Sequence, residues 1–257
     1  MTQQTAVMGR LVRLAGAGLL LTFAVAAQGS AENRLTADEL SAGWRLLFDG
    51  TTSDGWLEVT GLAFPQSCWS VENGCLRARP NPQGFQDLRT RALYGSFDLQ
   101  FEWRLTAGGN SGVKYLVQRT DRWQRKGEPE FSARARGLEY QIADDLGNPD
   151  ARSSPMRATA SLYSFLAPYR RVEVKPGAFH RSRIIVKGDQ VEHWMDGVQV
   201  LDFKLSQPVV ADALRQMRAK PQAGATSALQ PERETFISLQ NHGSEIEFRN
   251  LKIKRLD

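Results

Sequence analysis

The segment 137–145, with the sequence GLEYQIADD, has the alternation of a β-strand that runs into an acidic turn. Its apolar and polar side chains take turns, and a period of two sends the two sets to opposite faces of a sheet. The apolar set can pack against a second sheet, so Glu139 and Gln141 lie in the middle of the other face. Because acidic side chains are unfavourable inside strands, a carboxylate at this position indicates a role other than stability.

Two further segments place polar side chains in the same way. In 113–117 (VKYLV), Lys114 falls opposite to the valines, and in 237–242 (ISLQNH), Gln240 and His242 fall opposite to the isoleucine and leucine. If the three strands share a sheet, five polar side chains gather on one face. They are Lys114, Glu139, Gln141, Gln240 and His242. We predict that this face is the active site.

The rest of the chain has the pattern of an all-β domain. Segment 97–105 alternates apolar and polar residues over its whole length, and two-residue hairpin turns are indicated at 73–74, 188–189 and 196–197. The predicted strands are 44–50, a hairpin at 68–78, 85–90, 95–105, 112–118, 137–143, 181–187, 190–195, 198–204, 235–242 and 245–255. A slip of phase in the last strand predicts a β-bulge near Arg249. Many short strands and few helices predict a two-sheet antiparallel sandwich or jelly roll.

Helices are predicted at only two places. A short helix follows the N-cap Thr36, which forms a capping box with Glu39, and a helical insertion is expected near 207–219. Residues 119–136 and 145–180 are predicted to be long irregular loops on either side of the Glu139 strand. Loops of this length in a compact domain usually carry function.

The N-terminus has the features of an export signal. Arg10 and Arg13 precede an apolar run at 14–27, and small residues follow it. The run is too short for a comfortable membrane span. We therefore predict a signal peptide at 1–31, a single domain at 32–257, and a periplasmic or secreted location.

Charge and cysteine content exclude other classes. The formal net charge is +5 and the basic residues are scattered among acidic ones, so nucleic acid is not expected as a partner. The two cysteines, Cys68 and Cys75, flank the turn Asn73-Gly74. This hairpin opposes Glu72 to Cys75, which leaves Cys68 about 13 Å along the strand, beyond the reach of a disulfide. Two free thiols are predicted.

Seven sequence blocks, taken in order, resemble the 3-keto-disaccharide hydrolase family over about residues 40 to 257. The blocks are LFDG at 47–50 with Gly55-Trp56, WSVENG at 69–74, GNSGVKY at 109–115, LEYQI at 138–142, VEHWMDG at 191–197, LQNHG at 239–243 and FRN at 248–250. The resemblance implies a concanavalin A-like jelly roll, a secreted bacterial protein and activity on sugars oxidised at C3. Such a substrate implies an upstream sugar oxidoreductase. Two loops differ from the family, ASLY at 160–163 and Phe179-His180, and leave the substrate preference open.

The chemistry that the family implies needs a base, a proton donor and a stabiliser for an enolate. A ketone at C3 acidifies the C2 proton, and the enolate formed by its removal can expel the glycosidic oxygen. Glu139 and His242 are predicted to share the acid and base roles, in an order left open, and Lys114 to stabilise the enolate. Five residues are predicted to bind substrate: Asn110, Gln141, Gln240, Trp123 and Tyr163.

Several alternatives remain at this point. Glu139 could pair with Lys114 as a plain salt bridge, and His242 could be a turn residue. No cofactor is predicted, although Asp144, Asp145 and Glu139 offer oxygen ligands suited to Ca²⁺. A conventional glycan hydrolase would need a second carboxylate, and its nearest position on this strand holds a glutamine. A non-catalytic carbohydrate-binding module is the other alternative, since fold does not determine function.

Overall fold

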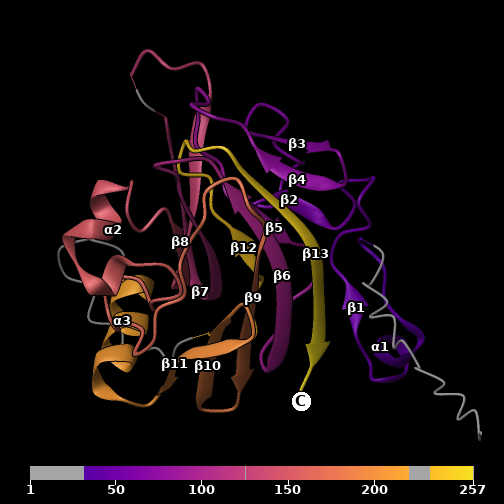
Figure 1. The fold of residues 1–257 in the computed structure, drawn as a ribbon. Helices are drawn as coiled ribbons and strands as arrows, with labels where there is room; N and C mark the ends of the chain where they lie inside the picture. Colours follow the sequence, from indigo (N-terminus) through magenta and orange to yellow (C-terminus); the bar gives the residue numbers. More distant parts are fainter. Residues whose placement is uncertain (1–31, 125, 220–231, 257) are drawn as a thin grey trace, which may run out of the picture.

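The computed structural model describes residues 32–124, 126–219 and 232–256. These residues form two antiparallel β-sheets with a few short helices, which confirms the all-β, two-sheet jelly-roll prediction (Figure 1). The predicted signal segment, 1–31, lies outside the described residues. The longest described helix, α3, has 11 residues, and none of the described helices is long and apolar enough to span a bilayer.

The larger sheet has eight strands in the order β11-β10-β9-β6-β13-β4-β3, with β1 paired to β13. Its strands are β1 (Arg45–Leu46), β3 (Trp69–Glu72), β4 (Cys75–Ala78), β6 (Phe97–Leu105), β9 (His180–Lys187), β10 (Gln190–Met195), β11 (Val198–Lys204) and β13 (Ile246–Arg255). The predicted bulge is present in β13, where the register with β6 shifts between Arg249 and Lys252 and Asn250 takes a positive φ of 51°.

The smaller sheet has five strands in the order β2-β5-β12-β7-β8. They are β2 (Trp56–Glu58), β5 (Leu88–Thr90), β7 (Asn110–Gln124), β8 (Phe131–Ala143) and β12 (Ser238–Leu239). The three strands that the alternation predicted to share a sheet, β7, β8 and β12, are neighbours. Their polar faces therefore form one surface.

The apolar faces of the two sheets meet in the core. Tyr115 and Tyr140 of the smaller sheet meet Phe97 and Phe101 of the larger one edge to face, with ring centroids 6.3 and 5.8 Å apart. All four rings are buried. Truncating one such ring to alanine costs about 3–5 kcal/mol. Because this packing holds one face of β7 and β8 inward, the alternating polar side chains must lie on the outer face.

The hairpin prediction for the cysteines is confirmed. β3 and β4 pair with Glu72 opposite Cys75 and Val71 opposite Leu76, and both cysteines are free. Desolvation by burial raises the pKa of Cys75 to about 11. The thiol is therefore protonated and unreactive at neutral pH.

The prediction that 119–136 forms an irregular loop is wrong. β7 continues to Gln124 and β8 begins at Phe131, so most of this segment belongs to a long hairpin. The segment lacks the apolar alternation that is typical of strands, because ion pairs take the place of apolar contacts there. Asp121 accepts hydrogen bonds from Arg119 Nε and Arg136 Nε, each at 2.7 Å.

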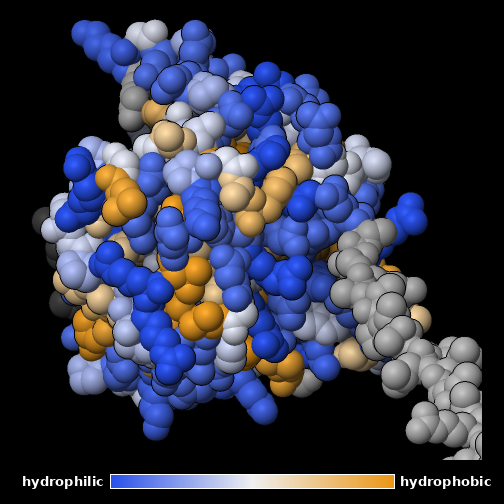
Figure 2. All heavy atoms as spheres, in the orientation of Figure 1, coloured by the Kyte–Doolittle hydropathy of each residue, from blue (hydrophilic) through white to orange (hydrophobic). Residues whose placement is uncertain are grey.

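Residues 145–180 are mostly irregular, as predicted, with α2 (Pro149–Ser153) and the 3₁₀ helix η1 (Pro155–Arg157) within them. The predicted capping box is present at α1 (Ala37–Ser41), and α3 (Pro208–Arg218) forms the predicted helical insertion. α2 and α3 lie on the β8 side of the molecule and α1 on the opposite side (Figure 1). On the face drawn in Figure 2, hydrophobic side chains form small separate groups among hydrophilic ones.

Candidate active site

The polar side chains of the smaller sheet lie in rows across neighbouring strands. Lys114 on β7 pairs with Glu139 on β8, and Ser238 on β12 pairs with Lys114 from the other side. One row away, Gly112 pairs with Gln141. Because residues paired across strands point to the same face, this register brings the predicted side chains together.

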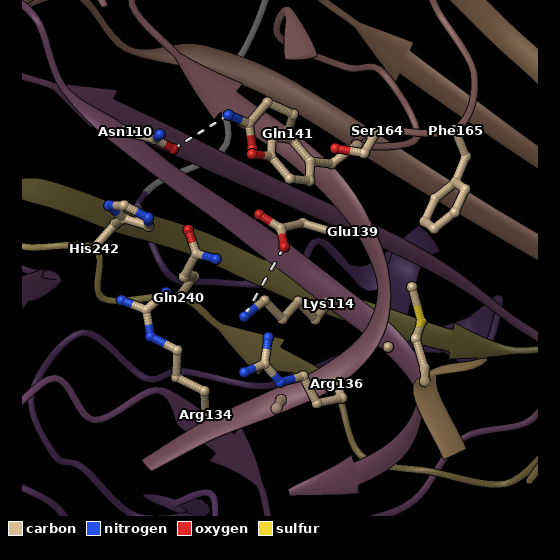
Figure 3. Close-up of a pocket in the computed structure, with 14 residues that line it drawn as sticks. Asn110, Lys114, Arg134, Arg136, Glu139, Gln141, Ser164, Phe165, Gln240 and His242 are labelled. Atoms are coloured by element: carbon tan, nitrogen blue, oxygen red, sulfur yellow. Dashed lines mark hydrogen bonds and ion pairs between the residues drawn. The ribbon is translucent and has the colours of Figure 1, made fainter. Parts of the chain in front are cut away.

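These rows form the floor of a cavity of about 330 Å³ (Figure 3). Seven of the eight predicted site residues line it: Asn110, Lys114, Glu139, Gln141, Tyr163, Gln240 and His242. Phe165, and Met217 from α3, add apolar surface to the lining. Glu139 and His242 thus share one cavity, as the strand alternation predicts, while their chemical roles stay predictions.

The Glu139 carboxylate lies over Gly112. A Cβ atom at position 112 would come within 2.5 Å of Glu139 Oε1, so the missing side chain leaves the space that the carboxylate occupies. The Glu139 side chain is only 12% exposed. Desolvation by burial raises the pKa of Glu139, opposed by the positive charges of Lys114 and Arg134. A carboxylate with a raised pKa is a stronger base than an ordinary glutamate.

Lys114 is held mainly by a second carboxylate, that of Asp87. Its Nζ atom lies 3.0 Å from Asp87 Oδ2 and 3.9 Å from Glu139 Oε2. Asp87 is fully buried and also accepts hydrogen bonds from the backbone N–H groups of Ala135 and Asn241. The closer ion pair of Lys114 is therefore with Asp87, and Glu139 is not held in a tight salt bridge.

Asp87 was not predicted from the sequence. The residue lies just before β5, and its neighbour Leu88 is buried in the core, so alternation places Asp87 on the polar face. The signal was weak because the apolar residues nearby, Phe85 and Leu88, are three positions apart rather than two.

Amide side chains occupy the remaining floor of the cavity. Gln141 Nε2 donates to Asn110 Oδ1 at 3.2 Å, and turning this amide over brings its nitrogen to 3.2 Å from both Glu139 Oε1 and Ser111 O. Gln240 is 5% exposed, and its buried Oε1 has no hydrogen-bond partner among the described residues. A buried acceptor without a donor is costly, so a molecule that brings an N–H or O–H group to this atom would be favoured in the cavity.

His242 lies at the exposed end of the cavity, in the segment that follows β12. The backbone here is fixed, since Gln240 N donates to Gly112 O at 2.9 Å and Gly243 turns the chain with a φ of 84°. Partial desolvation lowers the pKa of His242, and the positive charges of Arg134 and Lys114 lower it further. The neutral imidazole is therefore favoured at neutral pH and can accept a proton.

A model of the 3-keto-alpha-glucoside-1,2-lyase-like domain matches residues 43–254, which is most of the chain. The chain belongs to this family. A 3-keto-disaccharide hydrolase of Bacteroides thetaiotaomicron is 30% identical over 234 residues, which cover 84% of this chain and 79% of the relative. Among solved structures, a candidate glycosyl hydrolase of Parabacteroides distasonis superposes with a TM-score of 0.70 at 27% identity, covering 88% of this chain and 100% of that one.

A second candidate glycosyl hydrolase of Parabacteroides distasonis has the same fold, with a TM-score of 0.59 at 23% identity over 83% of this chain and 99% of that one. Together with the family match, these relatives support a function of the glycoside hydrolase type.

In this family member, a loop holds Tyr163 beside the Glu139 strand. Tyr163 N donates to Glu139 O at 3.0 Å, and Ala160 N donates to Gln141 O at 2.8 Å, so the loop pairs with β8 like a short strand. The Tyr163 hydroxyl donates to Asp150 Oδ2 at 2.9 Å. Desolvation by burial raises the pKa of Tyr163, so the phenol stays protonated. Tyr163 therefore offers its ring and a neutral hydroxyl to the cavity.

The structure does not bring Trp123 into the cavity. It pairs with Ser132 in the outer part of the β7–β8 hairpin, and it is not among the residues that line the site. Two arginines from the same hairpin, Arg134 and Arg136, do line the cavity. These two arginines were not predicted from the sequence, because their segment was assigned to a loop.

His193 lies in the core behind the site. It is fully buried, its Nε2 lies 2.8 Å from Tyr115 Oη, and its Nδ1 lies 2.9 Å from Ala160 O. Desolvation lowers the pKa of His193 to about 4, so the ring is neutral at neutral pH. His193 therefore has a structural role, because it links the larger sheet to the strands that carry the site.

The two carboxylates of the acidic turn after β8 accept hydrogen bonds from backbone N–H groups. Asp144 accepts hydrogen bonds from the backbone N–H groups of Gly108, Leu146 and Gly147, and Asp145 accepts one from Thr159 N. Within the described ranges, no group of three or more His, Cys, Asp or Glu side chains is placed to hold a metal ion. Of the three carboxylates suggested for Ca²⁺, Asp144 and Asp145 thus stabilise the turn and Glu139 lines the cavity.

Proposed function

We propose that this protein cleaves the glycosidic bond of 3-keto-glycosides, including 3-keto-disaccharides, by elimination followed by hydration. The observation that carries the proposal is the Glu139–Lys114 pair in one cavity, a carboxylate with a raised pKa beside a fixed ammonium group. The name of the Bacteroides relative and the family description support the same substrate class.

The reaction begins with removal of the C2 proton, which the C3 ketone acidifies. The electron pair of the C2–H bond forms the enolate, whose negative charge lies on the C3 oxygen. When the enolate collapses, a C1–C2 double bond forms and the C1–O bond breaks, and the glycosidic oxygen leaves with a proton. Water then adds across the double bond, with OH at C1 and H at C2, to give the free 3-keto sugar.

In this proposal Glu139 takes the C2 proton. Its raised pKa makes it a stronger base than an ordinary carboxylate, and its position over Gly112 directs it into the cavity. Lys114, fixed by Asp87, supplies positive charge for the enolate oxygen. His242 at the exposed end exchanges protons with the leaving group and with water. The reverse assignment of Glu139 and His242 is the alternative that the variants test.

A conventional glycan hydrolase is less well supported by the same cavity. That mechanism needs two available carboxyl groups, about 5–5.5 Å apart for retention or about 6.5–9.5 Å for inversion. The second carboxylate near Glu139 is Asp87, which is fully buried and already accepts hydrogen bonds from Lys114, Ala135 and Asn241. It is therefore not available to attack a sugar or activate water.

The test compares a 3-keto-glycoside with its unoxidised parent in deuterated water. We expect cleavage of the first only, with solvent deuterium at C2 of the released sugar after subtraction of exchange in an enzyme-free control. Cleavage of both sugars without label at C2 would contradict the proposal in favour of direct displacement at C1. Binding of sugar without cleavage of either would make the protein a carbohydrate-binding module.

We also propose that the protein is exported and acts after a sugar oxidoreductase that forms the 3-ketone. The proposal rests on the basic, apolar and small-residue order of segment 1–31 and on the need for a ketone in the substrate. N-terminal sequencing of protein recovered from the periplasm or medium should find a start between Gln28 and Glu32. Recovery of uncleaved protein in the cytoplasm alone would contradict export.

A further inference from the structure

The cavity contains two arginines that a regular β8 strand would direct away from it. Arg134 and Arg136 have even numbers, whereas Glu139 and Gln141, which line the same cavity, have odd ones. The register of β7 and β8 breaks between Tyr115 and Arg119, where four steps along β7 oppose two along β8. The burial pattern of β8 changes phase at the same place.

The cause of the shift is visible in the backbone. Leu116 takes a positive φ of 47°, and a Cβ atom at Gly137 would come within 2.7 Å of Tyr115 O. On one side of this break Leu138 and Tyr140 are buried, and on the other side Ala133 and Ala135 are buried. The bulge therefore turns the arginine pair toward the cavity, as Figure 3 shows.

The three basic side chains of the cavity differ in whether a carboxylate lies close to them. Lys114 is paired with Asp87, and Arg136 Nε lies 2.7 Å from Asp121 Oδ2. Arg134 donates a hydrogen bond of 3.4 Å to Asn241 O and makes a cation–π contact with the Phe85 ring at 5.7 Å. Among the described residues its guanidinium group forms no ion pair within 4.0 Å, although its charge acts on Glu139, and its Nε is buried without a hydrogen-bond partner.

Gln240 gives an independent indication of the ligand. Its buried Oε1 has no donor among the described residues, so it needs a hydroxyl or another N–H or O–H group. Among the described residues Arg134 has no ion-pair partner within 4.0 Å and Gln240 Oε1 has no donor, and both residues line the same cavity. A sugar acid carries both complements, a carboxylate that an arginine binds through two hydrogen bonds and a set of hydroxyl donors.

We infer that the cavity accepts a 3-keto-glycoside in which the unit bound near Arg134 carries a carboxylate, as a glycuronic acid does. The inference rests on the proposed function and specifies its substrate class. The competing explanation is that Arg134 only adjusts the basicity of Glu139, to which its charge is coupled. That role affects neutral and anionic substrates equally, whereas a carboxylate site does not.

The kinetic test uses two 3-keto-glucosides that differ only in the leaving unit, glucose or glucuronic acid. We expect a kcat/KM at least tenfold higher for the substrate with glucuronic acid as leaving unit, and this kcat/KM should decrease steeply as the salt concentration rises. Arg134→Met should reduce kcat/KM for this substrate at least tenfold more than for the substrate with glucose as leaving unit. Arg181→Met, which removes an arginine that is 70% exposed on the larger sheet, should leave the ratio unchanged. Equal losses on both substrates in Arg134→Met would overturn the inference.

A binding test separates this inference from the proposed function, because it needs no turnover. Calorimetry with the wild-type protein should show tighter binding of glucuronate than of glucose, and Arg134→Met should abolish the difference. This result supports the carboxylate site even if no 3-keto-glycoside is cleaved. Equal binding of glucose and glucuronate, or tighter binding of glucose 6-phosphate than of glucuronate, would overturn the assignment.

Discussion

Two carboxylates lie within 4.0 Å of the Lys114 ammonium group, that of Asp87 just before β5 and that of Glu139 on β8. On the β5 side, Asp87 is fully buried and accepts hydrogen bonds from the lysine and from two backbone N–H groups. On the β8 side, Glu139 has the lysine only at 3.9 Å, and burial raises its pKa. The supply of hydrogen-bond donors therefore distinguishes them. Asp87, which accepts three hydrogen bonds, stabilises the fold. Glu139, which has fewer donors, keeps its basicity.

The largest expected effect comes from removing the charge of Asp87. Asp87→Asn leaves Lys114 buried without its close ionic partner, and breaking a buried pair typically costs about 3–5 kcal/mol of unfolding free energy. Urea unfolding measures this loss. Asp144→Asn is the matched control, because that buried carboxylate accepts only backbone N–H groups. An equal effect of the two substitutions would contradict a special role for the Asp87–Lys114 pair.

Glu139→Gln, in contrast, should reduce activity and not stability. The amide keeps the size of the side chain and removes its basicity, so kcat/KM on a 3-keto-glycoside should fall about 100-fold or more, equivalent to about 2.7 kcal/mol. The melting temperature should hold or rise, because a neutral amide costs less to bury than a carboxylate. Glu173→Gln, at a side chain that is 72% exposed, serves as the control. Full activity in folded Glu139→Gln would remove Glu139 from the centre of the site.

Gly112→Ala and Gly137→Ala should separate activity from folding. A Cβ at 112 meets the mobile end of Glu139, so the carboxylate is displaced and activity should fall about tenfold with little change in stability. A Cβ at 137 meets the backbone of Tyr115 at 2.7 Å and cannot be accommodated by a rotamer change, so stability should fall. Kinetics and thermal melting of both variants check this pair. Unchanged activity of Gly112→Ala would show that the carboxylate tolerates displacement.

The smallest effect concerns the pH dependence of stability. The pKa of Glu139 is raised in the folded protein above its ordinary value of 4.5, so the folded state holds the proton longer than the unfolded state does. Stability from this group is therefore greatest below about pH 4.5 and is lost as the pH rises through the folded pKa. Urea unfolding at a series of pH values should show that Glu139→Gln becomes more stable relative to the wild type as the pH rises. The reverse trend would mean that Glu139 is stabilised as a carboxylate.

The sequence predicted the fold and the floor of the site well, because both follow from alternation. Once Tyr140 is buried, Glu139 must face the other way, and a shared sheet brings Lys114 beside it. The prediction failed where side-chain direction depends on a bulge. Leu116 and Gly137 shift the phase of the hairpin, and nothing in the alternation of 119–136 shows that Arg134 enters the cavity while Trp123 does not.

Asp87 could not be recognised for a different reason. Its importance depends on the hydrogen bonds that reach it from Ala135 and Asn241, which are distant in the sequence. Such long-range donors become apparent only when the strands are in register.

β8 is the last strand of the smaller sheet, and a long unpaired edge of this kind can recruit a strand from another molecule. Here the chain covers that edge itself around the site, because Ala160 and Tyr163 donate their backbone N–H groups to Gln141 O and Glu139 O. The loop that forms one wall of the cavity thus also guards against aggregation. Shortening it to admit larger substrates should expose the edge, so engineered variants of this loop will have to be selected for solubility as well as for turnover.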